Sequence, residues 1–511
     1  MTDADPPIRA AAALSLAEAF GVQAVRRPDA PALVQDGRVL SYRVLDDRAG
    51  RLAAVLAACG AGAGERVAIL AENRAEYLEL FLAAARTGAV VACQNWRLAA
   101  PELAHCLRLA APALAIVSER HAAALTRLDH GIARTIVLGG EYEHLLAAAA
   151  PLAPQPLDPE TGLLILYTSG TTGLPKGALI SHRALLARAM VAAADWGIGP
   201  DAFIAWTPLF HMGAADEALA TLLGGGKVLV MDGFDAAALA GAVAGERIGH
   251  LTVVPGVVDR LLAQLRQARM RPAGVRVVGV MADLVPPAQI AELTALLDAP
   301  YGNTFGSTET GMPPASRGLI PPGVAPATLA KTQSSLCAVR LLDPAGQEVA
   351  PGEPGELAMR GPTLFSGYWG DAVANAEAFR DGWFHMGDVF RRLADGTLDF
   401  VDRSKYLIKS GGENVYPAEV ERALLAVPGV ADAAVVRQAD ARWGEVPVAF
   451  VVRDDPSLTE EALLAACRLR IAGYKLPKAV LFIADADLPR STSGKIQRHL
   501  LERRLAVAAG R

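Results

Sequence analysis

The stretch Tyr167-Thr168-Ser169-Gly170-Thr171-Thr172-Gly173-Leu174-Pro175-Lys176-Gly177-Ala178 decides how the rest of the chain is interpreted. It follows an apolar run at 163–166 that is short enough to form a buried strand. The ten residues after Tyr167 hold four hydroxyls, three glycines and one lysine. Glycines bring backbone N–H groups close to a ligand, hydroxyls add donors, and Lys176 adds a cation that can meet a polyphosphate. The pattern predicts a loop that binds a nucleotide's phosphate tail, with an ordinary surface turn as the alternative. Its spacing is not that of a Walker A loop.

Length and composition predict a large globular protein. A chain of 511 residues with 52% hydrophobic and 20% charged residues is too long for one core, so two or more domains are expected. The net charge of −5 argues against a general nucleic-acid binder. The five cysteines are scattered without zinc-ligand spacing, as expected for reduced thiols in the cytoplasm. The N-terminus lacks a signal-peptide pattern, and no apolar run is long enough to span a bilayer. We therefore expect a cytoplasmic protein that is not an integral membrane protein, and a homodimer is left open.

Strand-like and helix-like segments alternate along most of the chain. Apolar runs at 66–70, 89–92, 114–117 and 135–138 are separated by helical patterns, which favours a largely parallel α/β sheet. Asp36-Gly37 between two alternating runs predicts a β-hairpin. Further strands are expected at 203–206, 227–231, 250–254 and 275–279. From Cys337 to Arg360 the pattern changes to alternation with turns, which indicates a small β subdomain.

The sequence therefore predicts an α/β fold with two main parts. A large N-terminal region with parallel sheets and the small β subdomain covers 1–402, a hinge covers 403–405, and a small α+β domain covers 406–511. The end of the small domain is basic, with Arg490, Lys495, Arg498, Arg503 and Arg504. This composition suits a mobile lid that closes on phosphates, and equally a solvated basic face.

A second candidate nucleotide motif is Asn303-Thr304-Phe305-Gly306-Ser307-Thr308-Glu309-Thr310-Gly311. A nucleotide site needs an apolar surface for the base, polar partners for the base edge, and an oxygen ligand for Mg²⁺. Phe305, Asn303 and Glu309 can fill these roles, and Thr308 can reach the α-phosphate. Read alone, the segment is more often a turn followed by a helix cap.

Five further segments carry candidate residues. They are Trp206-Thr207-Pro208-Leu209-Phe210-His211-Met212-Gly213, Gly382-Trp383-Phe384-His385-Met386-Gly387-Asp388, Asp402-Arg403-Ser404-Lys405, Lys409-Ser410-Gly411-Gly412-Glu413-Asn414-Val415-Tyr416-Pro417 and Pro489-Arg490-Ser491-Thr492-Ser493-Gly494-Lys495-Ile496-Gln497-Arg498. An acid such as Asp388 suits vicinal hydroxyls, and paired glycines let a thin ligand pass close to the backbone. Taken singly, His211 reads as a core histidine and Lys495 as a surface lysine.

Taken in order from about residue 20 to 500, these segments resemble the motifs of the adenylate-forming superfamily, and acyl-CoA synthetases in particular. The resemblance implies that β- and γ-phosphates are held by Thr168, Ser169, Gly170, Thr171, Thr172 and Lys176. It implies that Asp388 accepts the ribose hydroxyls, that Arg403 meets ribose or phosphate, and that Lys405 is the hinge residue. It further implies that Lys495 meets the α-phosphate, that Gly411, Gly412 and Trp443 face CoA, and that His211 lies near the carboxylate and gates it.

The resemblance implies an AMP-forming acid–thiol ligase that uses ATP, Mg²⁺ and CoA. The acid would attack the α-phosphorus of ATP while Thr308 reaches the α-phosphate and Lys495 neutralises the charge that gathers between the reacting groups, and CoA would then displace AMP. Glu309 would hold the metal ion. Three alternatives stay open: an enzyme that loads a carrier protein, a luciferase-like oxygenase, and a nucleotide sensor without catalysis.

The acid itself cannot be named from the sequence. Candidate pocket positions are His211, Met212, Gly213, Val254, Asp283, Gly302, Phe305, Gly306 and Met312. The segment Gly279-Val280-Met281-Ala282-Asp283-Leu284 departs from the superfamily's usual Gly-Gly-Ala-Pro-Leu. Asp216, Glu217 and Asp283 are acidic for a plain fatty-acyl tunnel and hint at a cyclic, aromatic or functionalised acid. Because charged side chains are mostly exposed, we expect instead that these three face solvent or cap helices.

Overall fold

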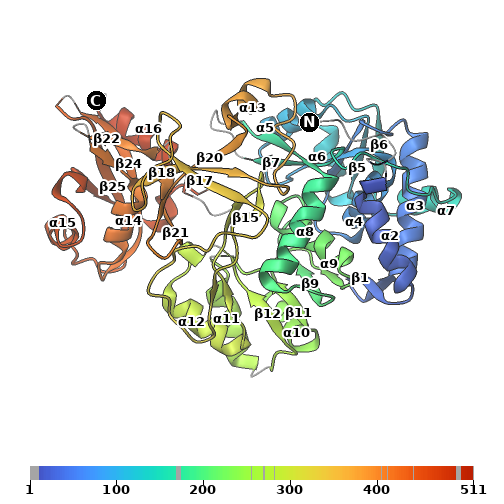
Figure 1. The fold of residues 1–511 in the computed structure, drawn as a ribbon, viewed down its shortest axis with the longest axis horizontal. Helices are drawn as coiled ribbons and strands as arrows, with labels where there is room; N and C mark the ends of the chain where they lie inside the picture. The colour runs from blue at the N-terminus through green and yellow to red at the C-terminus, as the bar shows by residue number, and fades with distance from the viewer. Residues whose placement is uncertain are drawn as a thin grey trace. The chain divides into compact units, whose positions relative to one another are not determined.

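The computed structural model describes residues 8, 11–168, 174–254, 256–268, 271–280, 282–403, 406–410, 413–440, 442–490 and 496–509. The chain forms two compact units (Figure 1). The first contains Met1–Ala338 and Arg360–Gly382, and the second contains Val339–Met359 and Trp383–Arg511. No helix in the described part of the chain combines the length and apolarity needed to cross a bilayer. The expected hinge at Lys405 lies outside the described residues and stays a prediction.

A six-stranded sheet in the first unit carries the predicted phosphate loop. Its strand order is β6-β5-β3-β4-β7-β8, and all neighbours are parallel except the β7–β8 hairpin. The bounds are β3 (Arg66–Leu70), β4 (Val90–Cys93), β5 (Leu114–Val117), β6 (Arg134–Val137), β7 (Gly162–Thr168) and β8 (Lys176–Ser181). The accompanying helices are α3 (Tyr42–Ala58), α4 (Ala75–Thr87), α5 (Ala100–Ala110), α6 (Glu119–Thr126) and α7 (Gly140–Ala148). The predicted parallel α/β sheet is confirmed, since central strands buried on both faces read as continuous apolar runs.

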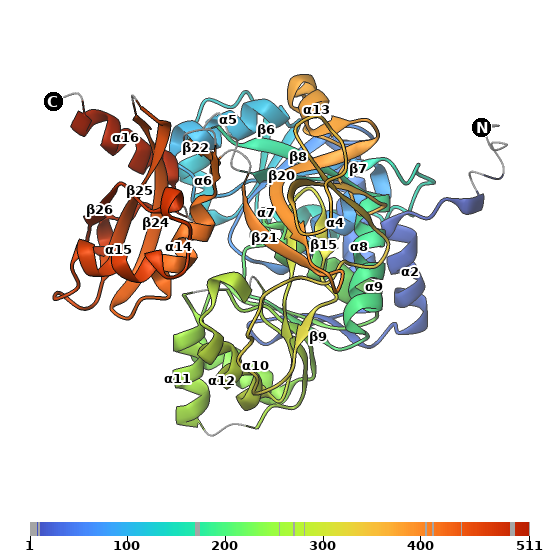
Figure 2. The ribbon, with the colours of Figure 1, turned by 60° about the vertical axis from the view of Figure 1, so that its left-hand side comes forward.

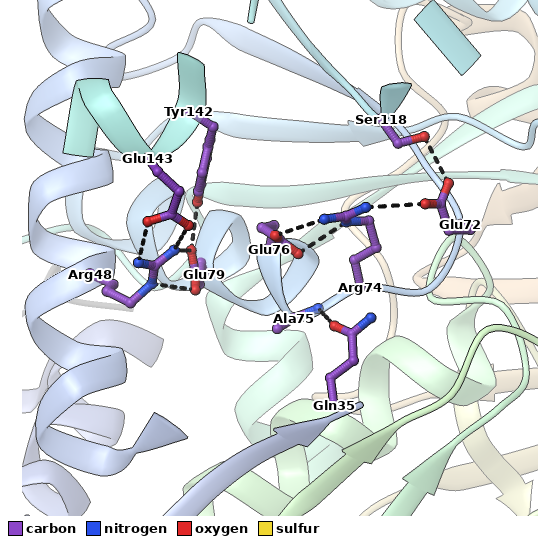
Figure 3. Close-up of polar contacts among 10 residues, drawn as sticks. All are labelled: Gln35, Arg48, Glu72, Arg74, Ala75, Glu76, Glu79, Ser118, Tyr142 and Glu143. Carbon is purple, nitrogen blue, oxygen red and sulfur yellow. Dashed lines mark hydrogen bonds and ion pairs between the residues drawn. The ribbon is translucent and has the colours of Figure 1, made fainter. Parts of the chain in front are cut away.

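The charges buried around α4 are paired (Figure 3). Arg48 of α3 donates to Glu79 of α4, from Nε to Oε1 at 2.6 Å, and to Glu143 of α7, from Nη2 to Oε1 at 2.7 Å. The Tyr142 hydroxyl also donates to Glu79, at 2.6 Å. At the start of α4, Arg74 bonds both neighbouring glutamates. Because every charge has an opposite partner, the desolvation of these buried groups is offset, and the Arg48 contacts tie three helices together.

An eight-stranded sheet forms the other half of the first unit, in the order β16-β13-β12-β11-β9-β10-β1-β2. The bounds are β1 (Pro31–Gln35), β2 (Arg38–Ser41), β9 (Ala202–Ala205), β10 (Val228–Val230), β11 (Ile248–Leu251), β12 (Val275–Val278), β13 (Tyr301–Gly302) and β16 (Leu319–Ile320). The predicted hairpin is confirmed, with φ of 49° at Asp36 and 79° at Gly37, as a tight primed turn requires. The strand expected at 250–254 instead starts at Ile248 and ends at Leu251.

Helices α10 (Ala236–Gly245), α11 (Val258–Ala268) and α12 (Pro287–Leu297) pack into the core of this sheet (Figure 1). The first unit also contains α2 (Leu16–Arg26), α8 (His182–Trp196), α9 (Met212–Leu223), the turn η1 (Ala282–Leu284), the hairpin β14 (Phe305–Ser307) and β15 (Gly311–Ala315), α13 (Ala372–Ala378) and β19 (Phe379–Arg380). Helix α8 packs against α9, which places the residues after the phosphate loop next to the predicted acyl-pocket segment.

The second unit begins with a sheet whose first two strands, β17 (Ala338–Leu342) and β18 (Pro354–Arg360), lie in the expected β subdomain at 337–360. The next strand, β20 (Trp383–Arg392), pairs antiparallel with β18 and with β21 (Leu398–Arg403). A second sheet contains β22 (Ile408–Ser410), β23 (Glu413–Val415), β24 (Val430–Asp440), β25 (Gly444–Arg453) and β26 (Ala479–Phe482). Its helices are α14 (Pro417–Leu425), α15 (Glu460–Arg468) and α16 (Arg498–Ala509), with short turns η3 (Gly473–Lys475) and η4 (Asp485–Asp487).

Period-two alternation explains the layers of this second sheet. On β24, Ala433 and Val435 join the core under α14 and α15, whereas Ala434 and Val436 join the core under α16. Successive side chains on a strand point to opposite faces, so one apolar strand supports helices on both sides (Figure 2).

Candidate active site

The predicted phosphate loop begins at the end of β7 and finishes at the start of β8. Thr168 and Lys176 are cross-strand partners, and residues 169–175 connect them in the chain. Ser169, Gly170, Thr171 and Thr172 lie outside the described residues. The Lys176 ammonium lies 3.9 Å from an oxygen of Asp371 and 5.1 Å from the centre of the Tyr368 ring. The lysine is thus held at the base of the loop, next to an aromatic ring that the sequence reasoning missed.

Tyr368 reaches the loop because its segment runs alongside β8. Trp369 N–H donates to Gly177 C=O at 2.7 Å, and Leu179 N–H donates to Gly367 C=O at 3.0 Å. The Tyr368 hydroxyl donates to Oε1 of Glu309 at 2.9 Å. Tyr368 therefore connects the predicted phosphate lysine to the predicted metal ligand. This pairing joins residues far apart in the chain, so no local sequence pattern could reveal it.

Thr308 and Glu309 lie on a tight turn between β14 and β15. Ser307 N–H donates to the Thr310 hydroxyl at 2.9 Å, and Phe365 N–H donates to Glu309 C=O at 2.8 Å. Gly311 closes the turn with φ of 75°, and a Cβ at this position would lie 2.9 Å from the Arg188 side chain. The turn therefore has little freedom, which suits the predicted role of Thr308 at the α-phosphate.

A buried arginine, Arg188 of α8, holds this turn by a hydrogen bond to its backbone. Its guanidinium donates to Thr308 C=O at 3.0 Å, to Thr363 C=O at 3.0 Å and to Asp216 Oδ2 on α9 at 3.0 Å. Burial raises the pKa of Asp216, and the Arg188 charge opposes that rise. Arg188 thus links the predicted adenylation turn to the helix that begins at the predicted acyl pocket. Sequence reasoning missed it because a lone arginine in a helix usually faces solvent.

The expectation that Asp216 and Glu217 face solvent or cap helices is wrong. Asp216 is buried against Arg188, and Glu217 is buried with Oε1 3.6 Å from Nδ1 of His250. The reason is that α9 is covered by α8 on one side and by the sheet on the other, so its polar residues must find partners inside.

Lys331, which the sequence reasoning missed, bonds both Asp283 and Asn303. The Lys331 ammonium donates to Oδ2 of Asp283 and to Oδ1 of Asn303. The Asn303 amide donates to Leu329 C=O at 3.2 Å and to Ala330 C=O at 3.0 Å. In this structure the amide of Asn303 holds the 329–331 segment, and its contact with a base edge stays a prediction.

An aromatic neighbour, Phe210, contacts the His211 ring. The Asn73 amide donates to Thr207 C=O at 2.8 Å, and its oxygen accepts from Leu209 N–H at 2.8 Å, which fixes the preceding backbone. The rings of His211 and Phe210 are 4.7 Å apart, and Trp96 meets Phe210 edge to face at 6.4 Å. His211 itself sits at the cap position of α9.

In the second unit, Asp388 and Arg403 are paired. They are register partners on β20 and β21, and Arg403 Nε lies 2.9 Å from Asp388 Oδ1. The predicted CoA contact Trp443 is 39% exposed, with the guanidinium of Arg442 4.7 Å and the ammonium of Lys478 5.9 Å from its rings. Lys405, Gly411, Gly412 and Lys495 lie outside the described residues.

Comparison with known proteins gives concordant matches along the chain. The AMP-binding enzyme family matches residues 20–369, and the AMP-binding enzyme C-terminal domain matches residues 419–495. A feruloyl-CoA synthase from Amycolatopsis sp is 37% identical over 95% of this chain and 99% of that protein. An indoleacetate–CoA ligase from Aromatoleum aromaticum is 36% identical over 94% of each chain. The solved structure of ATP-bound MatB from Rhodopseudomonas palustris is 29% identical with a TM-score of 0.83, covering 96% of this chain and 99% of that one.

Proposed function

Because the chain belongs to the AMP-binding enzyme family and is an AMP-forming carboxylic acid–CoA ligase, we propose that it works in two steps with separate residues. ATP and CoA are its substrates together with a carboxylic acid. In the first step the acid's carboxylate attacks the α-phosphorus of ATP, forming an acyl-adenylate and releasing pyrophosphate. In the second step the CoA sulfur attacks the acyl carbon and AMP leaves.

The first step requires charge stabilisation, because two anions must react. Thr168, Lys176 and residues 169–172 are proposed to hold the β- and γ-phosphates. Thr308 is proposed to meet the α-phosphate, and Lys495 to neutralise charge between the reacting groups. The single observation that best supports this assignment is the contact chain from Lys176 over the Tyr368 ring to Glu309, because it joins the predicted phosphate lysine to the separately predicted Mg²⁺ ligand.

Glu309 fits the role of a Mg²⁺ ligand, because Mg²⁺ is usually held by one or two carboxylates together with substrate phosphates. The Tyr368 hydroxyl fixes the orientation of one of its oxygens. Bound Mg²⁺ would supply positive charge that offsets the charge of the phosphates.

For the nucleoside and for CoA we propose the residues that the motifs indicate. Phe305 would stack on the base, and Asp388 with Arg403 would meet the ribose. Gly411, Gly412 and Trp443 would face CoA, and Arg442 and Lys478 beside the Trp443 ring supply cations that suit its phosphates. A swing about Lys405 would replace Lys495 by the CoA-binding loop between the steps.

We propose that the acid is aromatic. Phe210 contacts both Trp96 and His211, so aromatic side chains border the predicted acyl-pocket segment, and such side chains suit contact with an aromatic acid. The names of the two relatives above also refer to acids that contain aromatic rings.

We propose the cytoplasm as the compartment of this protein, because all five cysteines are free thiols.

A panel of acids tests these proposals by pyrophosphate release and by thioester formation. The panel contains cinnamate, 4-hydroxycinnamate, indole-3-acetate and octanoate, each with and without CoA. We expect CoA thioesters from the aromatic acids and little from octanoate. Thioester transfer only to a carrier protein would favour the loading alternative, and light emission or O₂ uptake would favour the oxygenase.

A further inference from the structure

Lys331 is the only lysine in the described part of the chain whose side chain is fully buried, at 0% exposure. Removing an ammonium from water is strongly unfavourable unless an opposite charge and hydrogen-bond acceptors replace the water. Asp283 and Asn303 provide these acceptors. Packing alone does not explain a lysine at position 331, because an apolar side chain there would pack without a desolvation penalty.

The network lies at the edge of the eight-stranded sheet where ligands are expected. Strands β12 and β13 are parallel neighbours, and Asp283 follows the end of β12 while Asn303 follows the end of β13. In open α/β sheets, ligands bind outside the carboxyl ends of the strands. The Tyr301 hydroxyl donates to Val280 C=O at 2.9 Å, which fixes the loop that leads to Asp283.

The two members of the ion pair differ in exposure. Lys331 is fully buried, whereas the Asp283 side chain is 35% exposed. An ionised carboxylate can only accept hydrogen bonds, and the hydrogen bond from the Lys331 ammonium fixes the orientation of the Asp283 carboxylate. Since the ammonium offsets its charge, the exposed part of Asp283 matches a neutral donor better than a cation. A second carboxylate on the substrate would be repelled.

We propose that Asp283, held by Lys331, determines substrate specificity by accepting a hydrogen bond from a donor on the acid's ring, such as a phenolic hydroxyl or an indole N–H. This inference rests on the proposed function, and it narrows aromatic acids to those that carry a neutral hydrogen-bond donor away from the reacting carboxylate.

The test compares 4-hydroxycinnamate with cinnamate, which differ only in the hydroxyl. The measured quantity is the ratio of kcat/KM for the two acids in CoA thioester formation. A hydrogen bond to a charged group predicts a preference of about 10- to 150-fold for the hydroxylated acid in the wild-type enzyme. Asp283→Ala is expected to reduce this ratio to about 1 to 3, because the discriminating acceptor is lost.

Two further variants separate recognition from folding. Asp259→Ala removes an exposed aspartate of the same unit, on α11, and is expected to keep the wild-type ratio. If Asp283→Ala fails to fold because Lys331 is left buried without its partner, the double variant Asp283→Leu with Lys331→Met removes both charges and the acceptor. It is expected to lower the ratio to about 1 to 3.

The outcomes distinguish this inference from the function on which it rests. Equal use of both acids by the wild-type enzyme, or an unchanged ratio in a folded Asp283 variant, would overturn the inference and leave the ligase assignment standing. Thioester formation from octanoate alone would also overturn the inference and leave the ligase assignment standing. Absence of any CoA thioester with the whole panel would instead reject the proposed function.

Discussion

Arg188→Met should destabilise the first unit and slow adenylation, and the two effects should be separable. Arg188 and Asp216 form a buried pair whose side chains are 3% and 11% exposed. Truncation removes three hydrogen bonds, two of them to backbone carbonyls at Thr308 and Thr363. It also leaves Asp216 buried without its cation. Breaking one partner of a buried pair usually costs about 3–5 kcal/mol.

The double variant Arg188→Met with Asp216→Leu tests the source of this loss. It replaces both charges by apolar groups, so we expect unfolding stability within about 1–2 kcal/mol of the wild type. Adenylation should nevertheless stay about 10- to 100-fold slow in both variants, because the anchor of the Thr308 turn is absent from each. Arg266→Met is the matched control: its pair with Glu292 is exposed, so the expected change is about 0–1 kcal/mol.

The assays are urea-induced unfolding and pyrophosphate release with a saturating acid. Since the chain has two units, the first unit's transition must be followed by its own probe, such as amide exchange in α8. A loss below about 1 kcal/mol for Arg188→Met would refute the buried-pair argument. Wild-type adenylation in the stable double variant would refute the positioning role of Arg188.

Three other perturbations give direct tests. Tyr368→Phe removes the hydroxyl that donates to Glu309, so kcat/KM for ATP measured across Mg²⁺ concentrations should fall about 10- to 100-fold; an unchanged value would remove Tyr368 from the site. His182 is buried, and its Nδ1 accepts the Leu16 N–H. Burial lowers its pKa from 6.5 to about 4, so the stability from the neutral ring is present above pH 6.5 and lost as pH falls toward 4. Between pH 7 and pH 5 the loss should be about 2 kcal/mol and should be absent from His182→Gln; equal pH slopes would contradict this. Lys405→Pro fixes φ at the proposed hinge, so it should leave pyrophosphate release intact and block CoA transfer, whereas equal loss of both would misplace the hinge.

Local sequence patterns were sufficient to predict most of the strands and turns discussed above. The run at 66–70 became β3 with the same bounds, because a strand between parallel neighbours is apolar on both faces. Asp36-Gly37 became a hairpin turn because both residues accept positive φ. The strand expected at 250–254 was displaced because its pairing with β12 ends at Leu251, which apolar content alone cannot locate.

The site was only partly predictable for a different reason. Thr308, Glu309 and Lys176 stand in local motifs, whereas the side chains that hold them are brought in by long-range packing. Arg188 lies 120 residues from Thr308, and Tyr368 lies 59 residues from Glu309. Lys331 was missed for the same reason, since its partners precede it by 28 and 48 residues. The general rule that charged residues face solvent also misplaced Asp216 and Glu217.

The two half-reactions of Lys495→Ala provide the most direct test of the two-step account. The variant should lose pyrophosphate-forming turnover by about 100-fold or more, because no other residue is proposed to neutralise the charge between carboxylate and α-phosphate. Supplied with the preformed acyl-adenylate, it should form the CoA thioester at close to the wild-type rate. Equal loss of both half-reactions, or retention of both, would contradict the assignment of separate residues to the two steps.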